Sequence, residues 1–158
     1  NPKDPAGYLS LALLYERDKD YGNAKKVYER AIKENPNFWF AANNLAFLLT
    51  ETSTGKEELA RAKTLAEEAI RQRPNEPALT DTLGWVYFRM GDFGQARGLI
   101  EQALAAAPDA DVLNYHMGAV LLKLGQRDAA REKLKKALDG SGDYLGRGEA
   151  EKMLKELG

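Results

Sequence analysis

Few side chains in this sequence are of the types that carry out catalysis, and their spacing does not bring them together. His116 is the only histidine. The acidic pairs Glu57-Glu58 and Glu67-Glu68 lie in helical sequence, where adjacent side chains diverge by about 100°. General acid–base catalysis needs groups that converge on one substrate. The sequence also lacks the zinc-protease, nucleophile-elbow and phosphate-loop motifs. We therefore predict that the chain is not an enzyme and has no catalytic residues, and we interpret His116 as a packed or surface residue.

Composition excludes further classes of protein. The 158 residues are 44% hydrophobic and 30% charged, which is too apolar for a disordered chain. Lys and Arg total 23 against 24 for Asp and Glu, so the net charge is -1 and no nucleic acid is expected as a partner. The basic stretch 131–136 is interrupted by Glu132 and Leu134, and we interpret it as a solvated helix face. Without Cys there are no disulfides or thiolate metal sites, and we predict no metal and no cofactor.

An internal repeat organises the sequence. Three sets of positions recur every 34 residues apart from one interval of 38: Pro2, Pro36, Pro74 and Pro108; Leu11, Leu45, Leu83 and Met117; Ala24, Ala62, Ala96 and Ala130. The longer interval comes second in the first two sets and first in the third. The four extra residues must then lie between Leu49 and Ala62, where residues 52–55 read Thr-Ser-Thr-Gly, a turn sequence. We predict a four-residue loop insertion inside the second unit.

Each unit has the pattern of two amphipathic helices joined by a turn. In the first unit, apolar residues at helical spacing form one stripe over residues 8–15 and a second over residues 24–32. Small residues recur on the first helix of each unit, at Ala12, Ala46, Gly84 and Gly118. They allow a second helix to approach closely, and a bulky side chain there would cost roughly 1–3 kcal/mol.

This pattern resembles the tetratricopeptide repeat, a helix–turn–helix unit of 34 residues. The first unit matches at Tyr8, Leu11, Ala12, Tyr15, Ala24, Tyr28, Ala31 and Pro36. The second unit has Ala42 and Leu49 at the two aromatic positions, and the fourth has Gly142 where the closing Pro is expected. The resemblance covers roughly the whole chain. It implies an all-α fold, a right-handed α-solenoid of four helical hairpins over residues 5–38, 39–76, 77–110 and 111–144.

The two ends of the sequence carry different signals. Pro2 lies one period before Pro36, so we expect at least one further repeat upstream and interpret the chain as a fragment of a longer array. Residues 145–157 lack the repeat signature, yet Ala150, Met153 and Leu157 share one helical face. We predict a capping helix that shields the last repeat from water.

The resemblance also implies that the first helices line a concave groove that binds a protein or peptide. The side chains it places in this peptide-binding groove are Phe40, Asn43, Asn44, Phe47, Asp81, Trp85, Phe88 and Tyr115. Aromatic residues beside amides and charges are typical of binding hot spots. Two alternatives stay open: Phe47 and Trp85 pack between neighbouring first helices, and Asn44 makes a hydrogen bond between repeats.

The expected ligand is more apolar than the acidic tail of a heat-shock chaperone. Family members that bind such tails use a carboxylate clamp of Lys, Asn and Arg, and of its positions only Asn44 is kept here. Leu9, Leu13, Ala78 and Thr82 occupy the others. An extended peptide or amphipathic helix suits this surface. We predict a non-catalytic interaction scaffold, with a homo-oligomerisation module and a regulatory or substrate-recruiting region of a larger enzyme as the alternatives.

A finer resemblance concerns the source. Residues 43–46, 81–85 and 115–118 together resemble the C-terminal repeats of large bacterial proteins, some of them lipoproteins associated with exopolysaccharide export and exosortases. This resemblance suggests a bacterial protein and a role in envelope assembly. No apolar run approaches the ~20 residues of a membrane span, so no direct membrane insertion is expected. The compartment stays unknown, with the bacterial cytoplasm and periplasm both open.

Overall fold

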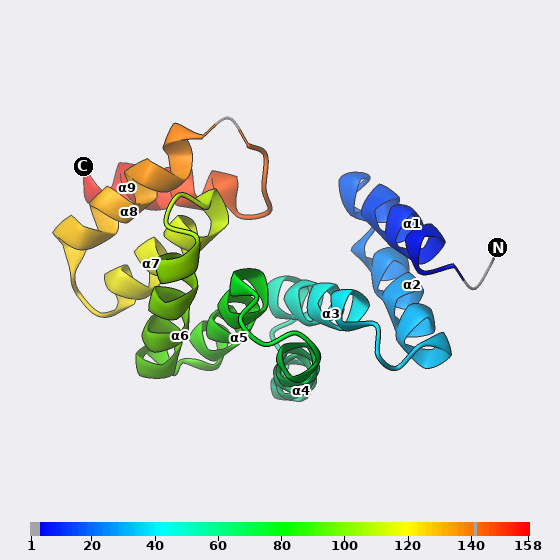
Figure 1. The fold of residues 1–158 in the computed structure, drawn as a ribbon. Helices are drawn as coiled ribbons and strands as arrows, with labels where there is room; N and C mark the ends of the chain where they lie inside the picture. Colours follow the sequence, from blue (N-terminus) through cyan, green and yellow to red (C-terminus); the bar gives the residue numbers. More distant parts are fainter. Residues whose placement is uncertain (1–3, 141) are drawn as a thin grey trace.

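The computed structural model describes residues 4–140 and 142–158, and this part of the chain is all-α. It forms nine helices: α1 (Pro5–Arg17), α2 (Tyr21–Glu34), α3 (Trp39–Thr52), α4 (Lys56–Gln72), α5 (Pro77–Met90), α6 (Phe93–Ala106), α7 (Asp111–Lys123), α8 (Arg127–Asp139) and α9 (Arg147–Leu157). Figure 1 shows them as hairpins that follow one another along an arched stack, ending with α9 beside α8. The predicted all-α solenoid is confirmed.

Local sequence explains where several helices begin and end. Asp20 and Asp92 accept hydrogen bonds from the backbone N–H groups of Asn23 and Gln95 at the starts of α2 and α6. These bonds satisfy donors that a helix N-terminus leaves unpaired. Gly91 ends α5 with a φ of 86°, a left-handed conformation that glycine adopts without a steric penalty. The turns inside the hairpins are therefore determined by local chemistry.

The four-residue insertion of the second unit lies in the helices, and the prediction of a longer loop is wrong. Residues 53–55 join α3 to α4, and this segment has the same three-residue length as 18–20 between α1 and α2. Instead α3 has 14 residues against 13 in α1, and α4 has 17 against 14 in α2. The acidic residues Glu57 and Glu58 in the first turn of α4 stabilise the positive end of the helix dipole. The early start of α4 absorbs most of the insertion.

Small residues set the spacing inside each hairpin. Ala12 and Ala46 are fully buried in the first two hairpins. In the next two, glycine takes this place: a Cβ atom built on Gly84 would lie 2.7 Å from Cγ1 of Ile100, and Gly118 is equally crowded. Each first helix therefore approaches its second helix more closely than a larger side chain would allow, as the sequence predicts.

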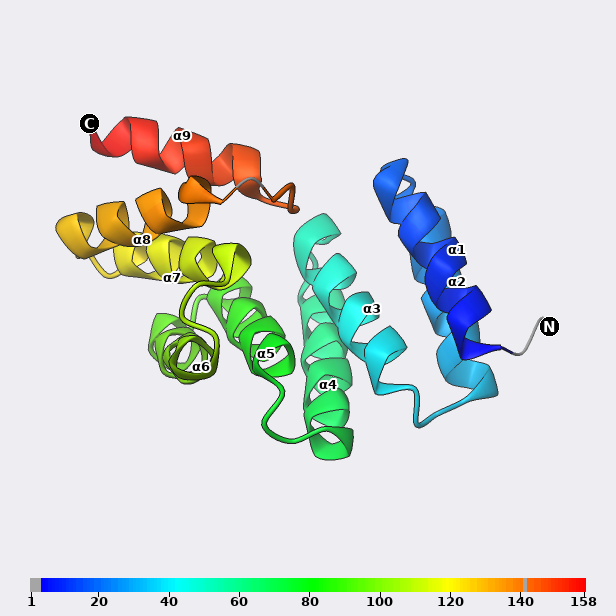
Figure 2. The same cartoon turned by 45° about the horizontal axis from the view of Figure 1, so that its top comes forward.

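Successive hairpins stack so that each later first helix is covered by the preceding second helix. Thus α2 packs on α3, α4 on α5, and α6 on α7, while α9 packs on both α7 and α8. First helices also meet one another at α3–α5 and α5–α7, but contacts between α1 and α3 are sparse by comparison. Figure 2 shows the α1–α2 hairpin at one end of the arch. The first hairpin is joined to the stack mainly through α2.

We predict that Gly84→Ala lowers the free energy of unfolding by about 1–3 kcal/mol, because the added methyl group overlaps Ile100 in a packed interface. Urea denaturation measures the change. Gly98→Ala is the matched control, since nothing lies within 4 Å of a Cβ atom at this position of α6. It should raise stability by up to about 1 kcal/mol through helix propensity. Equal effects of the two substitutions would contradict the close approach at Gly84.

Candidate binding surface

Helix α3 presents aromatic and amide side chains that are only partly buried. They are Phe40, Asn43, Asn44 and Phe47. On α1, Leu13 is 47% exposed and lies on the same side of the helix as Glu16, one turn later. Glu16 is linked to α3 by a chain of hydrogen bonds, so this side of α1 is turned toward α3. We call Leu13 together with the four α3 residues the α1–α3 surface.

Hydrogen bonds connect the first hairpin to the second across this surface. The Asn43 amide N–H donates to Oδ1 of Asn44 at 3.4 Å, and the Asn44 amide N–H donates to the Tyr28 hydroxyl at 2.9 Å. The Tyr28 hydroxyl in turn donates to Oε1 of Glu16 at 2.6 Å. The amide of Asn44 is thereby used within the protein, which confirms the interpretation of Asn44 as a link between repeats. Asn43 keeps an acceptor, since its Oδ1 is buried with no hydrogen-bond partner among the described atoms.

Burial shifts the titration of the two acids in this chain of hydrogen bonds. Burial raises the pKa of the Glu16 carboxyl above its ordinary value, and the hydrogen bond from Tyr28 partly opposes the shift. Burial also raises the pKa of the Tyr28 hydroxyl, and so does its hydrogen bond to Glu16. The Tyr28 proton is therefore retained at neutral pH and is available to bridge α1 and α3.

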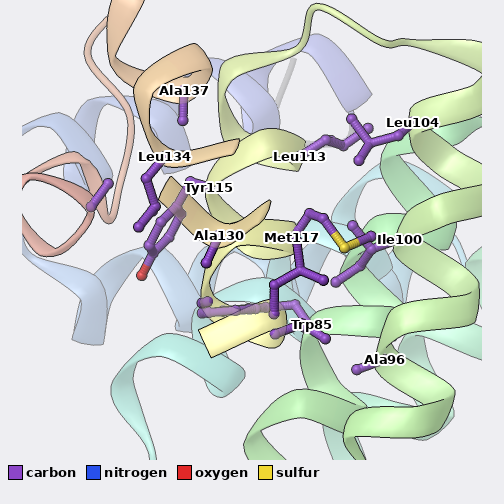
Figure 3. Close-up of a cluster of buried hydrophobic side chains, with 14 of the residues drawn as sticks. Trp85, Ala96, Ile100, Leu104, Leu113, Tyr115, Met117, Ala130, Leu134 and Ala137 are labelled. Carbon is purple, nitrogen blue, oxygen red and sulfur yellow. The ribbon is translucent and has the colours of Figure 1, made fainter. Parts of the chain in front are cut away.

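Trp85 lies inside the stack, where three hairpins meet. Its ring stacks on Phe88 of the same helix, with centroids 4.5 Å apart, and on His116 of α7, with centroids 4.0 Å apart. Tyr115 contacts the same ring at 5.5 Å. Figure 3 shows Trp85 at the edge of a cluster that includes Ile100, Met117 and Leu134. Only 3% of Trp85 is exposed, so it serves as a core residue of the third and fourth hairpins.

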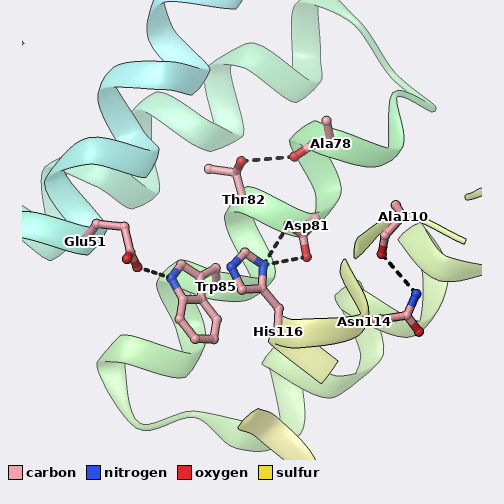
Figure 4. Close-up of polar contacts among 8 residues, drawn as sticks. All are labelled: Glu51, Ala78, Asp81, Thr82, Trp85, Ala110, Asn114 and His116. Atoms are coloured by element: carbon pink, nitrogen blue, oxygen red, sulfur yellow. Dashed lines mark hydrogen bonds and ion pairs between the residues drawn. The ribbon is translucent and has the colours of Figure 1, made fainter. Parts of the chain in front are cut away.

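Several polar groups around Trp85 are paired with one another, while Nε2 of His116 is buried with no hydrogen-bond partner among the described atoms. The Trp85 indole N–H donates to the Glu51 carboxylate, which also forms an ion pair with Arg89 at 3.7 Å. Beside the indole, Nδ1 of His116 lies 2.8 Å from Oδ2 of Asp81 (Figure 4). A carboxylate can only accept a hydrogen bond, so Nδ1 is the donor. These pairs satisfy groups that would otherwise be costly to bury.

Three of the eight predicted groove residues do not face an open surface, and for them the prediction is wrong. Asp81, Trp85 and Tyr115 are 4%, 3% and 3% exposed. Asp81 is held by His116, and Tyr115 is covered by the segment before α9, where the Tyr144 ring lies 6.0 Å away. The α1–α3 surface contains four of the other five, Phe40, Asn43, Asn44 and Phe47. Phe88 is partly buried and stacks on Trp85. Phe47 is also partly packed, with its ring 6.2 Å from His116.

Sequence reasoning did not identify Tyr28 and Glu16 as the hydrogen-bonded groups behind Asn44, or Glu51 as the partner of Trp85. It treated Tyr28 as a packing residue, and the useful signal is that a buried tyrosine hydroxyl needs a hydrogen-bond partner. The partners come from helices that are far apart in sequence. Their positions therefore could not be inferred from one repeat alone.

The described residues contain no group of three or more His, Cys, Asp or Glu side chains placed to hold a metal ion. Within the same residues, no helix is both long and apolar enough to cross a membrane.

A cavity of about 510 Å³ lies between the α1–α2 turn and the segment 143–148 that leads into α9. Glu16 and Arg17 line one side and Tyr144 and Arg147 the other, so both ends of the arch approach each other there.

Fold and surface together define a helical-repeat solenoid with an open inner face. Family models for the tetratricopeptide repeat match residues 5–38, 53–117 and 87–143. The chain belongs to the tetratricopeptide repeat family. A TPR repeat-containing protein of Pseudomonas aeruginosa is 30% identical over 95 residues, a match that covers 60% of this chain and 16% of that protein. This chain therefore spans less than a fifth of the length of that relative.

Solved structures share the fold at low sequence identity. A thermophilic TPR protein of Thermus thermophilus has a TM-score of 0.78 and 23% identity, and the match covers 98% of this chain and 84% of that chain. YrrB, described as a TPR protein with an unusual peptide-binding site, has a TM-score of 0.62 and 18% identity, covering 99% and 77% of the two chains. These likenesses concern the fold.

We predict that Trp85→Ala lowers the free energy of unfolding by about 3–5 kcal/mol, because it leaves a large cavity between Phe88 and His116 and removes the partner of Glu51. Thermal and urea denaturation measure the loss. Trp39→Ala is the control, since Trp39 is only partly buried and contacts Phe40 and Arg73 near the start of α3. A loss of stability for Trp85→Ala no larger than that for Trp39→Ala would contradict the assignment of Trp85 to the core and would support its assignment to the groove.

We also predict that Tyr28→Phe costs about 1–3 kcal/mol, since it leaves Glu16 and Asn44 without their shared partner. Chemical denaturation at pH 7 gives this value. No loss would show that the bridge between α1 and α3 contributes nothing to stability.

Glu16→Gln is the companion variant, because it keeps an acceptor for Tyr28 and removes the charge. The raised pKa of Glu16 means that the folded protein binds this proton more tightly than the unfolded chain. The pKa of this carboxyl in the unfolded chain is 4.5. As the pH rises above that value, ionisation of Glu16 therefore lowers the free energy of unfolding. We expect the stability of the wild type to fall relative to Glu16→Gln between about pH 4 and pH 7.

Proposed function

We propose that this chain is a non-catalytic scaffold that binds an apolar peptide or helix of a partner protein on the α1–α3 surface. The observation that carries the proposal is the exposure of Leu13, 47% of which is accessible on the side of α1 turned toward α3. Its position corresponds to that of Trp85 in the third unit, which is buried. Exposed apolar side chains mark interaction sites when they gather in a patch with other apolar groups, as Leu13 does with the aromatic rings of α3.

The neighbouring residues supply both apolar area and polar specificity. Phe40 and Phe47 are partly buried, so their rings are held in place yet still accessible. Large aromatic side chains of this kind provide much of the binding energy of an interface. Asn43 lies between them on α3 and is partly buried, with its Oδ1 enclosed by the protein. The amide N–H that Asn44 does not use is the group of Asn43 that suits a hydrogen bond to the backbone of a peptide.

The scaffold is ordered before the ligand binds. The α3 backbone is packed against α4 and α5, and the α1 side is tied to it through Tyr28. Little conformational entropy is then lost by the protein on binding, which favours affinity. YrrB, which shares the fold, is described as having a peptide-binding site. This description adds support for a peptide as the class of ligand.

The surface favours a ligand that is more apolar than an acidic tail. Leu9 and Leu13 stand on α1 where a carboxylate clamp would place a cation and an amide, and no basic residue belongs to the α1–α3 surface. The finer part of the proposal is a role in bacterial envelope or polysaccharide-export assembly. It is supported by the sequence motifs at 43–46, 81–85 and 115–118.

Selection of a phage-displayed peptide library against the chain tests the proposal. We predict enrichment of peptides with apolar and aromatic residues, and an affinity about tenfold lower for Phe40→Ala than for the wild type. Fluorescence anisotropy with a selected peptide gives the dissociation constants. Leu124→Ala is the matched control, because this exposed leucine follows α7 at a distance from α3. Selected peptides whose binding is indifferent to both Phe40→Ala and Leu13→Asp would overturn the assignment of the surface.

A further inference from the structure

The 510 Å³ cavity between the two ends of the arch is large enough to receive a long side chain of a ligand. In Figures 1 and 2 the turn between α1 and α2 faces the segment before α9 across the open side of the arch. Each wall contributes an aromatic ring, Tyr21 on one side and Tyr144 on the other. Both walls belong to the described part of this chain, so we ask which chemistry the cavity selects.

Glu16 on the α1 wall is a partly buried carboxylate without a cation. Its Oε1 accepts a hydrogen bond from Tyr28 at 2.6 Å. Among the described residues, no Lys, Arg or His forms an ion pair with Glu16. The adjacent Arg17 is paired with Asp18 at 3.1 Å. Because a carboxylate has more acceptor sites than one hydrogen bond uses, Glu16 can bind a further donor.

Burial raises the pKa of the Glu16 carboxyl. This is the effect expected of a carboxylate that is partly removed from water with no positive charge beside it. A cation brought into the cavity would supply that charge, and the ionised form of Glu16 would then be stabilised. The electrostatics of Glu16 therefore agree with its place in the cavity.

The other charges around the cavity also favour a cation. Arg147 donates hydrogen bonds to the backbone carbonyls of Leu138 and Gly140 and lies 3.6 Å from Glu151. Residues 16–20 contain three acids and two bases, and residues 143–151 contain three acids and one base. The exposed Lys19 opposes the preference, but the surrounding acids outweigh it.

The cavity is continuous with the α1–α3 surface. Leu13 and Glu16 are three residues apart on α1, which places their Cβ atoms about 5–6 Å from each other. An extended peptide advances about 3.3–3.6 Å per residue. A ligand with an apolar residue on Leu13 therefore brings a second side chain to Glu16 about two residues further along.

We propose that the cavity binds an arginine or lysine side chain of the partner peptide, with the cation paired to Glu16 beside the rings of Tyr21 and Tyr144. The aromatic rings add an attraction for a cation. This inference rests on the proposed function, since the apolar residues of the same peptide lie on the α1–α3 surface. It adds a rule of specificity: the ligand carries a basic residue about two residues from the apolar residue that contacts Leu13.

Nα-acetyl-arginine methylamide is the first probe, because it presents a guanidinium group without the apolar contacts of a peptide. We expect it to cause saturable NMR shifts of the backbone amides of Gly146 and Gly148, which line the cavity. Glu16→Gln should weaken this binding about tenfold, and Lys19→Gln should strengthen it. Glu132→Gln is the matched control, since Glu132 is exposed on α8 and is not part of the cavity wall.

A peptide selected on the whole chain is the second probe, compared with the same peptide in which citrulline replaces its basic residue. Citrulline keeps the length of arginine and removes its charge. The replacement should weaken binding to the wild type about tenfold and binding to Glu16→Gln less than twofold. Circular dichroism melting shows that each variant is folded.

Three results would overturn the proposal. They are the absence of saturable shifts at Gly146 and Gly148, equal effects of citrulline on the wild type and on Glu16→Gln, and tighter binding of Nα-acetyl-aspartate methylamide than of the arginine probe. In the last case the cavity would select an anion. The arginine probe needs no peptide, so it decides the cavity even if the library yields no ligand for the α1–α3 surface. The two proposals therefore fail separately.

Discussion

Each helix of this chain buries its apolar stripe only by packing against other helices, and small residues determine how closely they can pack. No hairpin encloses a core alone, so burial depends on how many neighbours a helix has. The contrast between two first helices shows the effect. All residues from Leu113 to Leu121 are buried in α7, which is packed among α5, α6, α8 and α9. In α1, which has α2 as its main neighbour, Ala12 alone is buried.

This uneven coverage accounts for the chemistry of the third and fourth hairpins. Where the helices are fully surrounded, the aromatic and polar side chains of the first helices face one another rather than solvent. Trp85 stacks between Phe88 and His116, and the carboxylates of Asp81 and Glu51 accept from His116 and Trp85. Residue types that suit a binding site therefore stabilise the packing between hairpins here. Trp85 is therefore closed to a ligand between α5 and α7.

The first two hairpins leave exposed the kinds of apolar side chain that the later two hairpins bury. Sparse contacts between α1 and α3 leave Leu13 exposed beside Phe40 and Asn43, and Leu11 and Leu14 of the same helix are also exposed.

The sequence by itself determined the helical repeats, because apolar spacing and small residues such as Ala12 and Gly84 act over a few residues of local chain. It also placed Phe40, Asn43 and Asn44 on the correct helix. It could not separate Phe40 from Trp85, which share the groove pattern but differ in burial. That difference is decided by His116 and Tyr115, which pack on Trp85 and are distant from it in sequence. The insertion near residue 55 shows the same limit of sequence analysis. Its turn-like residues predicted a longer loop, whereas α3 and α4 contain the extra residues. Local patterns specify elements, whereas exposure depends on which elements meet.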